Sequence, residues 1–279
     1  MKKITDLKVR IVGAGNMATS LIGGLLKRGF MPSQITASDP GGHQRQIVTE
    51  KYGVQTFSDN NAHFGIPDVV ILAVKPQIMK QVAQDIANSV IETNALVISI
   101  AAGIKIEHLE KWLSPNKNKV AIVRTMPNTP ALIGEGATGL FANDNVSTAQ
   151  MHLTEGIMDS VGISHWVDEE FKIDVVTALS GSGPAYFFLF MEYMQNAAIE
   201  LGLKPEVAAK LTEQTALGSA ILAQRSADDI KVLRQRVTSP NGTTEAALKS
   251  FESNGIEQTI KAAIKAANDR SIQLSKDFS

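Results

Sequence analysis

The chain has 279 residues, a length that suggests about two domains. Its 27 lysine and arginine residues nearly balance 28 aspartate and glutamate residues, and the net charge of −1 argues against a protein that works by binding nucleic acid. The sequence has no cysteine, which excludes disulfides, thiolate zinc sites and a catalytic thiol. Charged residues at positions 6, 8 and 10 break the apolar stretch near the start, and no uninterrupted apolar run approaches the ~20 residues of a membrane span. We therefore expect a soluble, cytoplasmic protein that binds neither membrane nor nucleic acid.

Short apolar runs alternate with helical patterns over the first part of the chain. The runs are rich in Val, Ile and Ala without polar alternation, which is typical of strands buried on both faces of a parallel sheet. We predict strands at 9–12, 35–38, 68–74, 95–100 and 120–124, and weaker ones at 137–141 and 163–167. We predict helices at 16–28, 43–52, 77–88, 106–112 and 148–161. This repetition predicts a doubly wound α/β domain over residues 1–168.

Strand signals stop after that point, and residues 169–279 form a predicted all-α domain. We predict helices at 171–179, 184–201, 205–225, 227–236, 244–254 and 255–275. The helix at 184–201 is apolar almost all round, so it must be buried almost all round. A domain of this size can hardly cover it alone, which favours a partner chain. A central helix of a large monomeric bundle is the alternative.

The turn after the first predicted strand reads Gly-Ala-Gly-Asn-Met-Ala at 13–18 and fits the dinucleotide-binding pattern G-x-G-x-x-A. The first glycine allows a tight turn, the second lets the backbone approach a pyrophosphate, and the small last residue lets the helix pack closely. The helix N-terminus then faces the anion. The position of the motif favours a Rossmann-type dinucleotide-binding domain over a tight turn without a ligand.

Asp39 ends the second predicted strand, where an acidic residue accepts hydrogen bonds from the adenine ribose of NAD. Its charge would repel the 2′-phosphate of NADP, whereas Arg45 could bind that phosphate. The two residues leave the choice between NAD and NADP open. An Asp-Pro turn at a strand end is the alternative interpretation.

Three further loops follow predicted strands, at the edge where open α/β sheets bind ligands. Lys75, in the loop 73–77, is either a cofactor neighbour or a solvated lysine. The loop 99–103 has small residues that leave room for a nicotinamide ring, although a plain strand end has the same composition. Two prolines stiffen the loop 124–130, which suits either a site or an interdomain hinge.

The segment 236–245 joins two predicted helices through a Ser-Pro-Asn-Gly turn followed by two threonines. One of these threonines, Thr243 or Thr244, is expected to cap the following helix. The free N–H groups there, together with the hydroxyls, would form an anion pocket for a small carboxylate. A plain helix–helix turn is the alternative. The five histidines are scattered, and we expect no metal site.

Taken together, these motifs resemble those of the pyrroline-5-carboxylate reductases, over roughly residues 9–274. The resemblance depends on the segments 13–18, 73–77, 99–103, 124–130, 180–186 and 237–244. It implies an oxidoreductase of proline biosynthesis that reduces 1-pyrroline-5-carboxylate to L-proline with NAD(P)H. It also implies intertwined helical domains that form a homodimer, with larger rings of dimers common in the family.

The resemblance carries roles over to matching positions. The positions that match the dinucleotide site are Val12, Gly13, Ala14, Gly15, Asn16, Met17, Asp39, Asn60, Ala73, Val74, Lys75, Pro76, Ala101, Ala102 and Gly103. The positions that match the substrate carboxylate site are Ser239, Gly242, Thr243 and Thr244, and the Thr244 hydroxyl lies near the ring nitrogen, which makes it the catalytic candidate. The family loop usually reads Ser-Pro-Gly-Gly, and Asn241 replaces its first glycine here. Because Asn tolerates left-handed backbone, we expect the turn to survive.

Two other functions compete with this interpretation. A β-hydroxyacid dehydrogenase would also join a Rossmann domain to helices, but it would need a general-base lysine that the segment 180–186 lacks. A non-catalytic dinucleotide sensor would keep the motif at 13–18 without needing a carboxylate pocket at 239–244.

Overall fold

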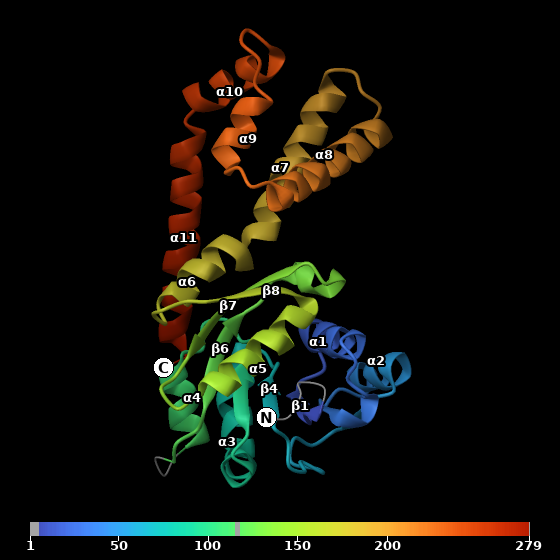
Figure 1. The fold of residues 1–279 in the computed structure, drawn as a ribbon, viewed down its shortest axis with the longest axis vertical. Helices are drawn as coiled ribbons and strands as arrows, with labels where there is room; N and C mark the ends of the chain where they lie inside the picture. Colours follow the sequence, from blue (N-terminus) through green and yellow to red (C-terminus); the bar gives the residue numbers. More distant parts are fainter. Residues whose placement is uncertain (1–5, 115–117, 279) are drawn as a thin grey trace. The chain divides into compact units, whose positions relative to one another are not determined.

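The computed structural model describes residues 6–114 and 118–278, which divide into two compact units (Figure 1). The first unit comprises Met1–Ser182 and Ala267–Ser279, and the second comprises Gly183–Ala266. These limits differ from the predicted domains, because the segment after the last strand and the end of the chain both fold with the sheet. Side-chain contacts of Asp174 and Ser271, described below, are the physical reason.

The first unit is built on an eight-stranded sheet. Its strands are β1 (Val9–Val12), β2 (Ile35–Ser38), β3 (Gln55–Phe57), β4 (Val69–Leu72), β5 (Leu96–Ser99), β6 (Ile122–Met126), β7 (Gly136–Ala142) and β8 (Gly162–Trp166). They follow the order β3-β2-β1-β4-β5-β6-β7-β8. The predicted strands are all present, and only the three-residue β3 was missed.

The sheet is parallel, as the strand pattern predicts, except at β7, which pairs antiparallel to β6. The chain between Met126 and Gly136 is shorter than the dozen or so residues that a parallel crossover needs. It holds only the short 3₁₀ segment Thr129–Ile133, so the chain turns back directly. All other neighbouring strands pair in parallel.

Helices cover both faces of this sheet. They are α1 (Asn16–Lys27), α2 (Gly42–Tyr52), α3 (Pro76–Thr93), α4 (Ile106–Leu113) and α5 (Thr148–Met158). Alternate residues of β4 enter two separate cores, since Val69 and Ile71 pack with α1, α2 and α5 while Val70 and Leu72 pack with α3 and α4. The result is the predicted Rossmann-type domain, with the ends of β1, β2, β4 and β5 directed to one edge.

The second unit is entirely helical in the described structure. It contains α7 (Gly183–Glu200), α8 (Pro205–Arg225), α9 (Ile230–Arg236), α10 (Thr243–Ser253) and the first part of α11 (Ile256–Asp277). Helix α9 begins three residues later than predicted, because the Asp229 carboxylate accepts a hydrogen bond from the Val232 N–H at 2.9 Å and caps it there. The predicted helical stretch at 171–179 is α6 (Lys172–Val176) followed by a π-helical turn, Thr177–Gly181.

The apolar helix α7 exposes large side chains within the single chain. Phe187 and Phe188 are 72% and 65% exposed, and Tyr193 is 62% exposed. By length and composition the helical stretch Lys172–Glu200 would suit a membrane span, but one such helix is weak evidence for a membrane protein. A helix whose apolar face is covered by a second protein chain is equally long and apolar, and it exposes the same large side chains in a single chain.

Candidate functional site

The glycine-rich turn lies where three segments of the first unit meet. The Gly13 N–H donates to the Ser38 carbonyl at 2.7 Å, and the Ala73 N–H donates to the Val12 carbonyl at 2.8 Å. Gly13 has a φ of +103°, and a Cβ there would lie 2.5 Å from the Ala73 oxygen. Only glycine fits this position, so the close approach between 12–13 and 73–74 explains the first glycine of the motif.

The N-terminus of α1 is open to a ligand. Gly15 is its N-cap residue and provides no side-chain cap, and a Cβ built at Gly15 would meet no atom within 4 Å. The first N–H groups of a helix need acceptors, and a phosphate is a suitable one. The residues present therefore fit the pyrophosphate of a dinucleotide, with Asn16 and Met17 in the first helical turn.

Next to this turn is a pocket of about 450 Å³. It is lined by Gly13, Ser38, Pro40, Ser58, Asp59, Asn60, Val74, Ile78, Gln81, Val82 and Asp85. Three of the predicted cofactor residues, Gly13, Asn60 and Val74, therefore line one cavity. The contribution of α3 was missed, although positions 78, 82 and 85 form one helical stripe directly after the predicted loop at 73–76.

Asp39 forms a hydrogen bond with the glycine-rich turn itself. Its Oδ2 accepts a hydrogen bond from the Ala14 N–H at 2.9 Å, and its Oδ1 accepts one from the Gly41 N–H at 2.8 Å. Each carboxylate oxygen can accept a further bond, so a ribose hydroxyl remains compatible with this geometry. Arg45 folds back and donates to the carbonyls of Asp39 and Pro40 at 2.6 and 2.9 Å.

A buried arginine shapes the loop that presents Asn60. Arg10 on β1 is fully buried, and its Nη2 donates to the carbonyls of Asp59, Asn60 and Ala62 at 3.0–3.3 Å. Burial lowers the pKa of Arg10, and Asp59 opposes that shift. The Asn60 side chain is fixed in turn, because its Oδ1 accepts a hydrogen bond from the Ser38 hydroxyl at 2.9 Å. Sequence reasoning missed this role of Arg10. Its only sign in the sequence was a charged residue within an otherwise apolar strand.

The loop 101–103 follows β5 at the same edge of the sheet. The Thr125 hydroxyl donates to the Ser99 carbonyl at 3.0 Å and fixes the end of the strand. Gly103 has a φ of +75°, and the side chains of Leu274 and Phe278 lie against it. Burial lowers the pKa of His108 on α4, which disfavours the charged form of its ring.

The predicted substrate loop lies in the second unit, at the N-terminus of α10. Asn241 adopts a left-handed φ of +58°, so the turn does survive the substitution of Asn for glycine. The expected threonine cap is wrong, because Gly242 is the N-cap residue and Thr243 and Thr244 are the first residues of the helix. Across the described chain, no protein group forms a hydrogen bond with either threonine hydroxyl. The uncapped N–H groups and the two hydroxyls remain available to an anion.

Glu245 stabilises this turn. Its carboxylate accepts a hydrogen bond from the Asn241 N–H at 2.6 Å and pairs with Lys249 at 3.0 Å. The Lys249 hydrogen bond and then the Asn241 N–H lower the pKa of Glu245, which keeps it ionised. It thereby holds Asn241 in the left-handed conformation.

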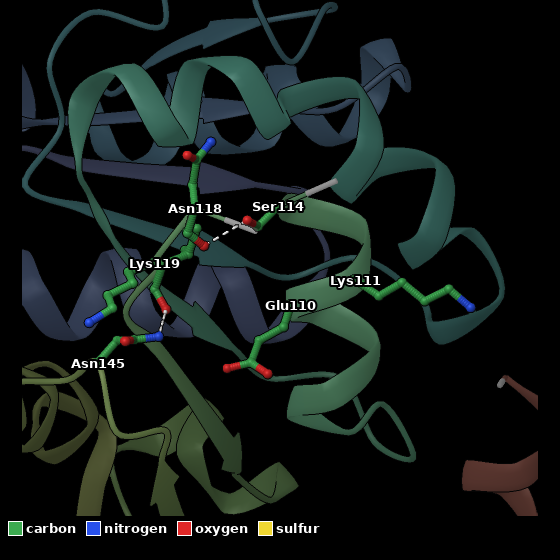
Figure 2. Close-up of a pocket in the computed structure, with 7 residues that line it drawn as sticks. Glu110, Lys111, Ser114, Asn118, Lys119 and Asn145 are labelled. Atoms are coloured by element: carbon green, nitrogen blue, oxygen red, sulfur yellow. Dashed lines mark hydrogen bonds between the residues drawn. The ribbon is translucent and has the colours of Figure 1, made fainter. Parts of the chain in front are cut away.

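A different pocket, shown in Figure 2, lies away from these residues. It has a volume of about 330 Å³ and lies between the end of α4 and the start of β6, with Glu110, Ser114, Asn118 and Asn145 in its wall. Parallel sheets bind ligands at the carboxyl ends of their strands, and this pocket is at an amino end. None of the predicted site residues lines it. Within the described ranges, no group of three or more His, Asp or Glu residues could hold a metal ion.

Comparison with known proteins finds a family match for each of the two parts of the chain. Residues 170–274 match the family model described as pyrroline-5-carboxylate reductase dimerisation, and residues 8–103 match the one described as NADP oxidoreductase, coenzyme F420-dependent. A pyrroline-5-carboxylate reductase from Pseudomonas aeruginosa is 49% identical over 97% of this chain and 98% of its own length.

This chain belongs to the pyrroline-5-carboxylate reductase family.

Solved structures of pyrroline-5-carboxylate reductases have the same fold. The enzyme from Coxiella burnetii is 44% identical with a TM-score of 0.92, covering 96% of this chain and 98% of that one. The enzyme from Plasmodium falciparum, solved with NADP bound, is 30% identical with a TM-score of 0.84, covering 98% of this chain and all of that one. The resemblance inferred from the sequence motifs is confirmed.

We predict that Asp39 sets the balance between the two dinucleotides. Asp39→Ser removes a negative charge beside the ribose and should shift the ratio of the NADH and NADPH dissociation constants about tenfold toward NADPH, a change of about 1.4 kcal/mol. Fluorescence titration with each reduced dinucleotide measures the ratio. Glu50→Gln, which removes a charge from the exposed side of α2, should leave the ratio unchanged. An unchanged ratio for Asp39→Ser would show that Asp39 does not lie at the ribose.

Proposed function

We propose that this chain reduces 1-pyrroline-5-carboxylate to L-proline by hydride transfer from NAD(P)H, the last step of proline biosynthesis, in the cytoplasm. The main support for this proposal is the 49% identity to a pyrroline-5-carboxylate reductase over nearly the whole chain. The N-terminus of α1 suits a dinucleotide and the N-terminus of α10 suits a small anion, and the reaction requires both ligands.

The first unit binds the cofactor, which supplies the hydride when bound. Gly13, Gly15 and the N-terminus of α1 hold the pyrophosphate, and Asp39 and Asn60 hold the adenosine side. The loop 101–103 receives the nicotinamide ring, because its small residues leave space at the carboxyl edge of the sheet.

The second unit binds the substrate carboxylate. The uncapped N-terminus of α10 offers backbone N–H groups and a favourable helix dipole for a negative charge. Ser239, Gly242 and Thr243 bind the carboxylate, and the hydroxyl of Thr244 contacts the ring nitrogen.

Little acid–base chemistry is required of the protein. A protonated cyclic imine is already an electrophile, so the residues must hold the C=N carbon in position and exclude water. Thr244 orients the imine through its ring nitrogen. The scattered histidines are consistent with a reaction that depends on positioning.

The chain acts as a homodimer, and dimers assemble into larger rings. The dimerisation model of the family covers residues 170–274, which include the exposed aromatic residues Phe187, Phe188 and Tyr193. Covering these side chains with a second copy removes a large apolar surface from water.

The activity is tested by following NAD(P)H consumption with 1-pyrroline-5-carboxylate and identifying proline as the product. Turnover supports the proposal. Oxidation of a 3-hydroxy acid with NAD(P)⁺ in its place would indicate a β-hydroxyacid dehydrogenase. Binding of NADPH without turnover of either substrate would indicate a dinucleotide sensor.

We predict that Thr244→Ala lowers kcat/KM for 1-pyrroline-5-carboxylate by about ten- to hundredfold. One hydrogen bond to a charged group is lost, worth about 1.5–3 kcal/mol. Neither the NADPH dissociation constant nor the melting temperature should change, because Thr244 does not cap α10. Steady-state kinetics, titration and thermal unfolding on one preparation measure all three.

Thr244→Ser keeps the hydroxyl and serves as the matched control. It should retain most of the activity. If Thr244→Ala keeps full activity but melts at a lower temperature, the loop is only a structural turn and the substrate binds elsewhere.

We predict that the exposed aromatic surface of α7 forms the dimer interface. Phe187→Glu introduces a charge there and should raise the dimer dissociation constant about thirtyfold or more, since a central interface residue contributes about 2 kcal/mol or more. Light scattering over a concentration series measures it. Ile163→Glu, at an apolar residue of β8 that is 52% exposed, is the control and should not change the mass. A wild-type protein that is a folded, active monomer at micromolar concentration would contradict the prediction.

A further inference from the structure

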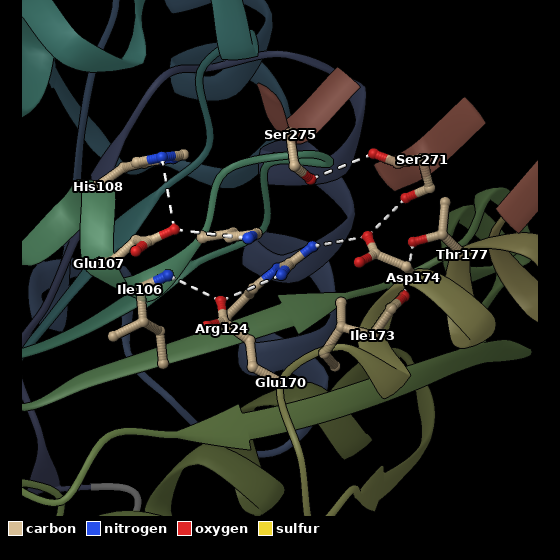
Figure 3. Close-up of polar contacts among 11 residues, drawn as sticks. Ile106, Glu107, His108, Arg124, Glu170, Ile173, Asp174, Thr177, Ser271 and Ser275 are labelled. Atoms are coloured by element: carbon tan, nitrogen blue, oxygen red, sulfur yellow. Dashed lines mark hydrogen bonds and ion pairs between the residues drawn. The ribbon is translucent and has the colours of Figure 1, made fainter. Parts of the chain in front are cut away.

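A second buried arginine lies between two carboxylates (Figure 3). Arg124 on β6 is 1% exposed, and its Nη1 lies 3.1 Å from Glu170 Oε1 while its Nη2 lies 3.3 Å from Asp174 Oδ1. The Asp174 side chain is 4% exposed and the Glu170 side chain 24%. One cation and two anions leave an excess negative charge in a buried place, so further donors are needed.

Two different segments of the chain supply these donors. The Ile106 N–H, at the start of α4, donates to Glu170 Oε1 at 2.8 Å. The Ser271 hydroxyl, on α11, donates to Asp174 Oδ1 at 2.7 Å. The cluster therefore ties the start of α4 and the last turns of α11 to the same strand, within the first unit (Figure 3).

Both tied segments border the loop 101–103. Helix α4 begins directly after it, at Ile106. Leu274 Cβ, on α11, lies 3.5 Å from the position that a Cβ of Gly103 would occupy, and the ring of Phe278, which directly follows α11, lies 3.4 Å from it. Phe278 also packs against the core cluster that contains Ala101 and Val12. The end of α11 thus lies against the loop that receives the nicotinamide ring in the proposed function.

We propose that Ser271 is a positioning residue for the nicotinamide side of the dinucleotide site. Its hydrogen bond to Asp174 holds the last turns of α11 in place, and Leu274 and Phe278 then hold the loop 101–103 in its binding conformation. The inference rests on the proposed function, because it assigns the loop to the nicotinamide ring.

The adenosine side of the site has its own support. Arg10 holds the loop that presents Asn60, and none of its hydrogen bonds involves α11 or the Arg124 cluster. A change at Ser271 should therefore alter binding of the nicotinamide ring and leave binding of the adenosine part unchanged. A role in stability alone would not separate the two parts of the cofactor.

The chain offers a matched control for this test. Ser275 lies one helical turn after Ser271 and is 1% exposed, and its hydroxyl donates to the Ser271 carbonyl of its own helix at 3.2 Å. It makes no contact with Asp174 by hydrogen bond. Ser275→Ala therefore removes a hydroxyl of equal burial from the same helix without releasing the cluster.

The experiment compares two probes on Ser271→Ala, Ser275→Ala and wild type. NADPH carries the nicotinamide ring, and 2′-phospho-ADP-ribose has the same adenosine and pyrophosphate without it. Ser271→Ala should raise the NADPH dissociation constant about tenfold, because the loop 101–103 loses part of its support, and leave that of the fragment within about twofold. Ser275→Ala should change neither. The value of kcat should fall with Ser271→Ala.

The outcomes separate the inference from the function. If Ser271→Ala weakens both probes equally, or lowers only the melting temperature, Ser271 has a structural role and the inference is overturned. If wild type binds neither probe, the proposed function itself fails.

Phe278→Ala is a second variant at the end of the helix that does not disturb the buried ion cluster. It should reproduce the tenfold loss for NADPH alone, and an unchanged NADPH affinity in this variant overturns the inference as well.

Discussion

The ion cluster around Arg124 is the constraint on which the limits of the sheet-containing unit depend. A guanidinium that is 1% exposed must keep its carboxylate partners, because leaving one charge of a buried pair without its partner costs about 3–5 kcal/mol. Both partners, Glu170 and Asp174, come from the segment after β8, and the Ser271 hydroxyl that completes the cluster comes from α11. These parts of the chain therefore fold with the sheet, although by pattern they are helical and adjoin the helical unit.

The cofactor edge shows a related use of buried charge. Arg10 and Arg124 lie on strands β1 and β6, and each donates hydrogen bonds to a loop or helix that follows another strand. An arginine can do this because its several donors bond to carbonyls and carboxylates in different directions. The loops that are proposed to bind the cofactor can then present small residues and open N–H groups, since contacts such as those of Arg10 hold their conformation.

Much of this organisation could be predicted from the sequence, for identifiable reasons. The strands β1 and β2 were found to the residue. Strand β4 could be recognised because a parallel sheet buries it on both faces and leaves a continuous apolar run. The glycine-rich turn, Asp39 and Asn241 could be placed because their residue types reflect local backbone requirements. The roles of α3, Arg10 and Ser271 could not, since each depends on contacts between segments 49 to 97 residues apart, or on which side of a helix faces a pocket.

The capping of α10 shows why a correct motif can still lead to a wrong detail. Threonine is a favoured N-cap residue, and the loop offers two, so the sequence predicts that one of them caps the helix. In the structure Gly242 takes the cap position, and Glu245 instead bonds back to the Asn241 N–H. A glycine at the cap leaves the first N–H groups of the helix without a side-chain acceptor, which is unfavourable for the isolated helix. It is favourable for a site that must bind a carboxylate, because a capping hydroxyl would occupy the donors that the ligand needs.

The same reasoning applies at the N-terminus of α1, where Gly15 is the cap residue and again offers no side-chain acceptor. Both proposed anion sites are thus helix N-termini that have glycine in place of a side-chain cap.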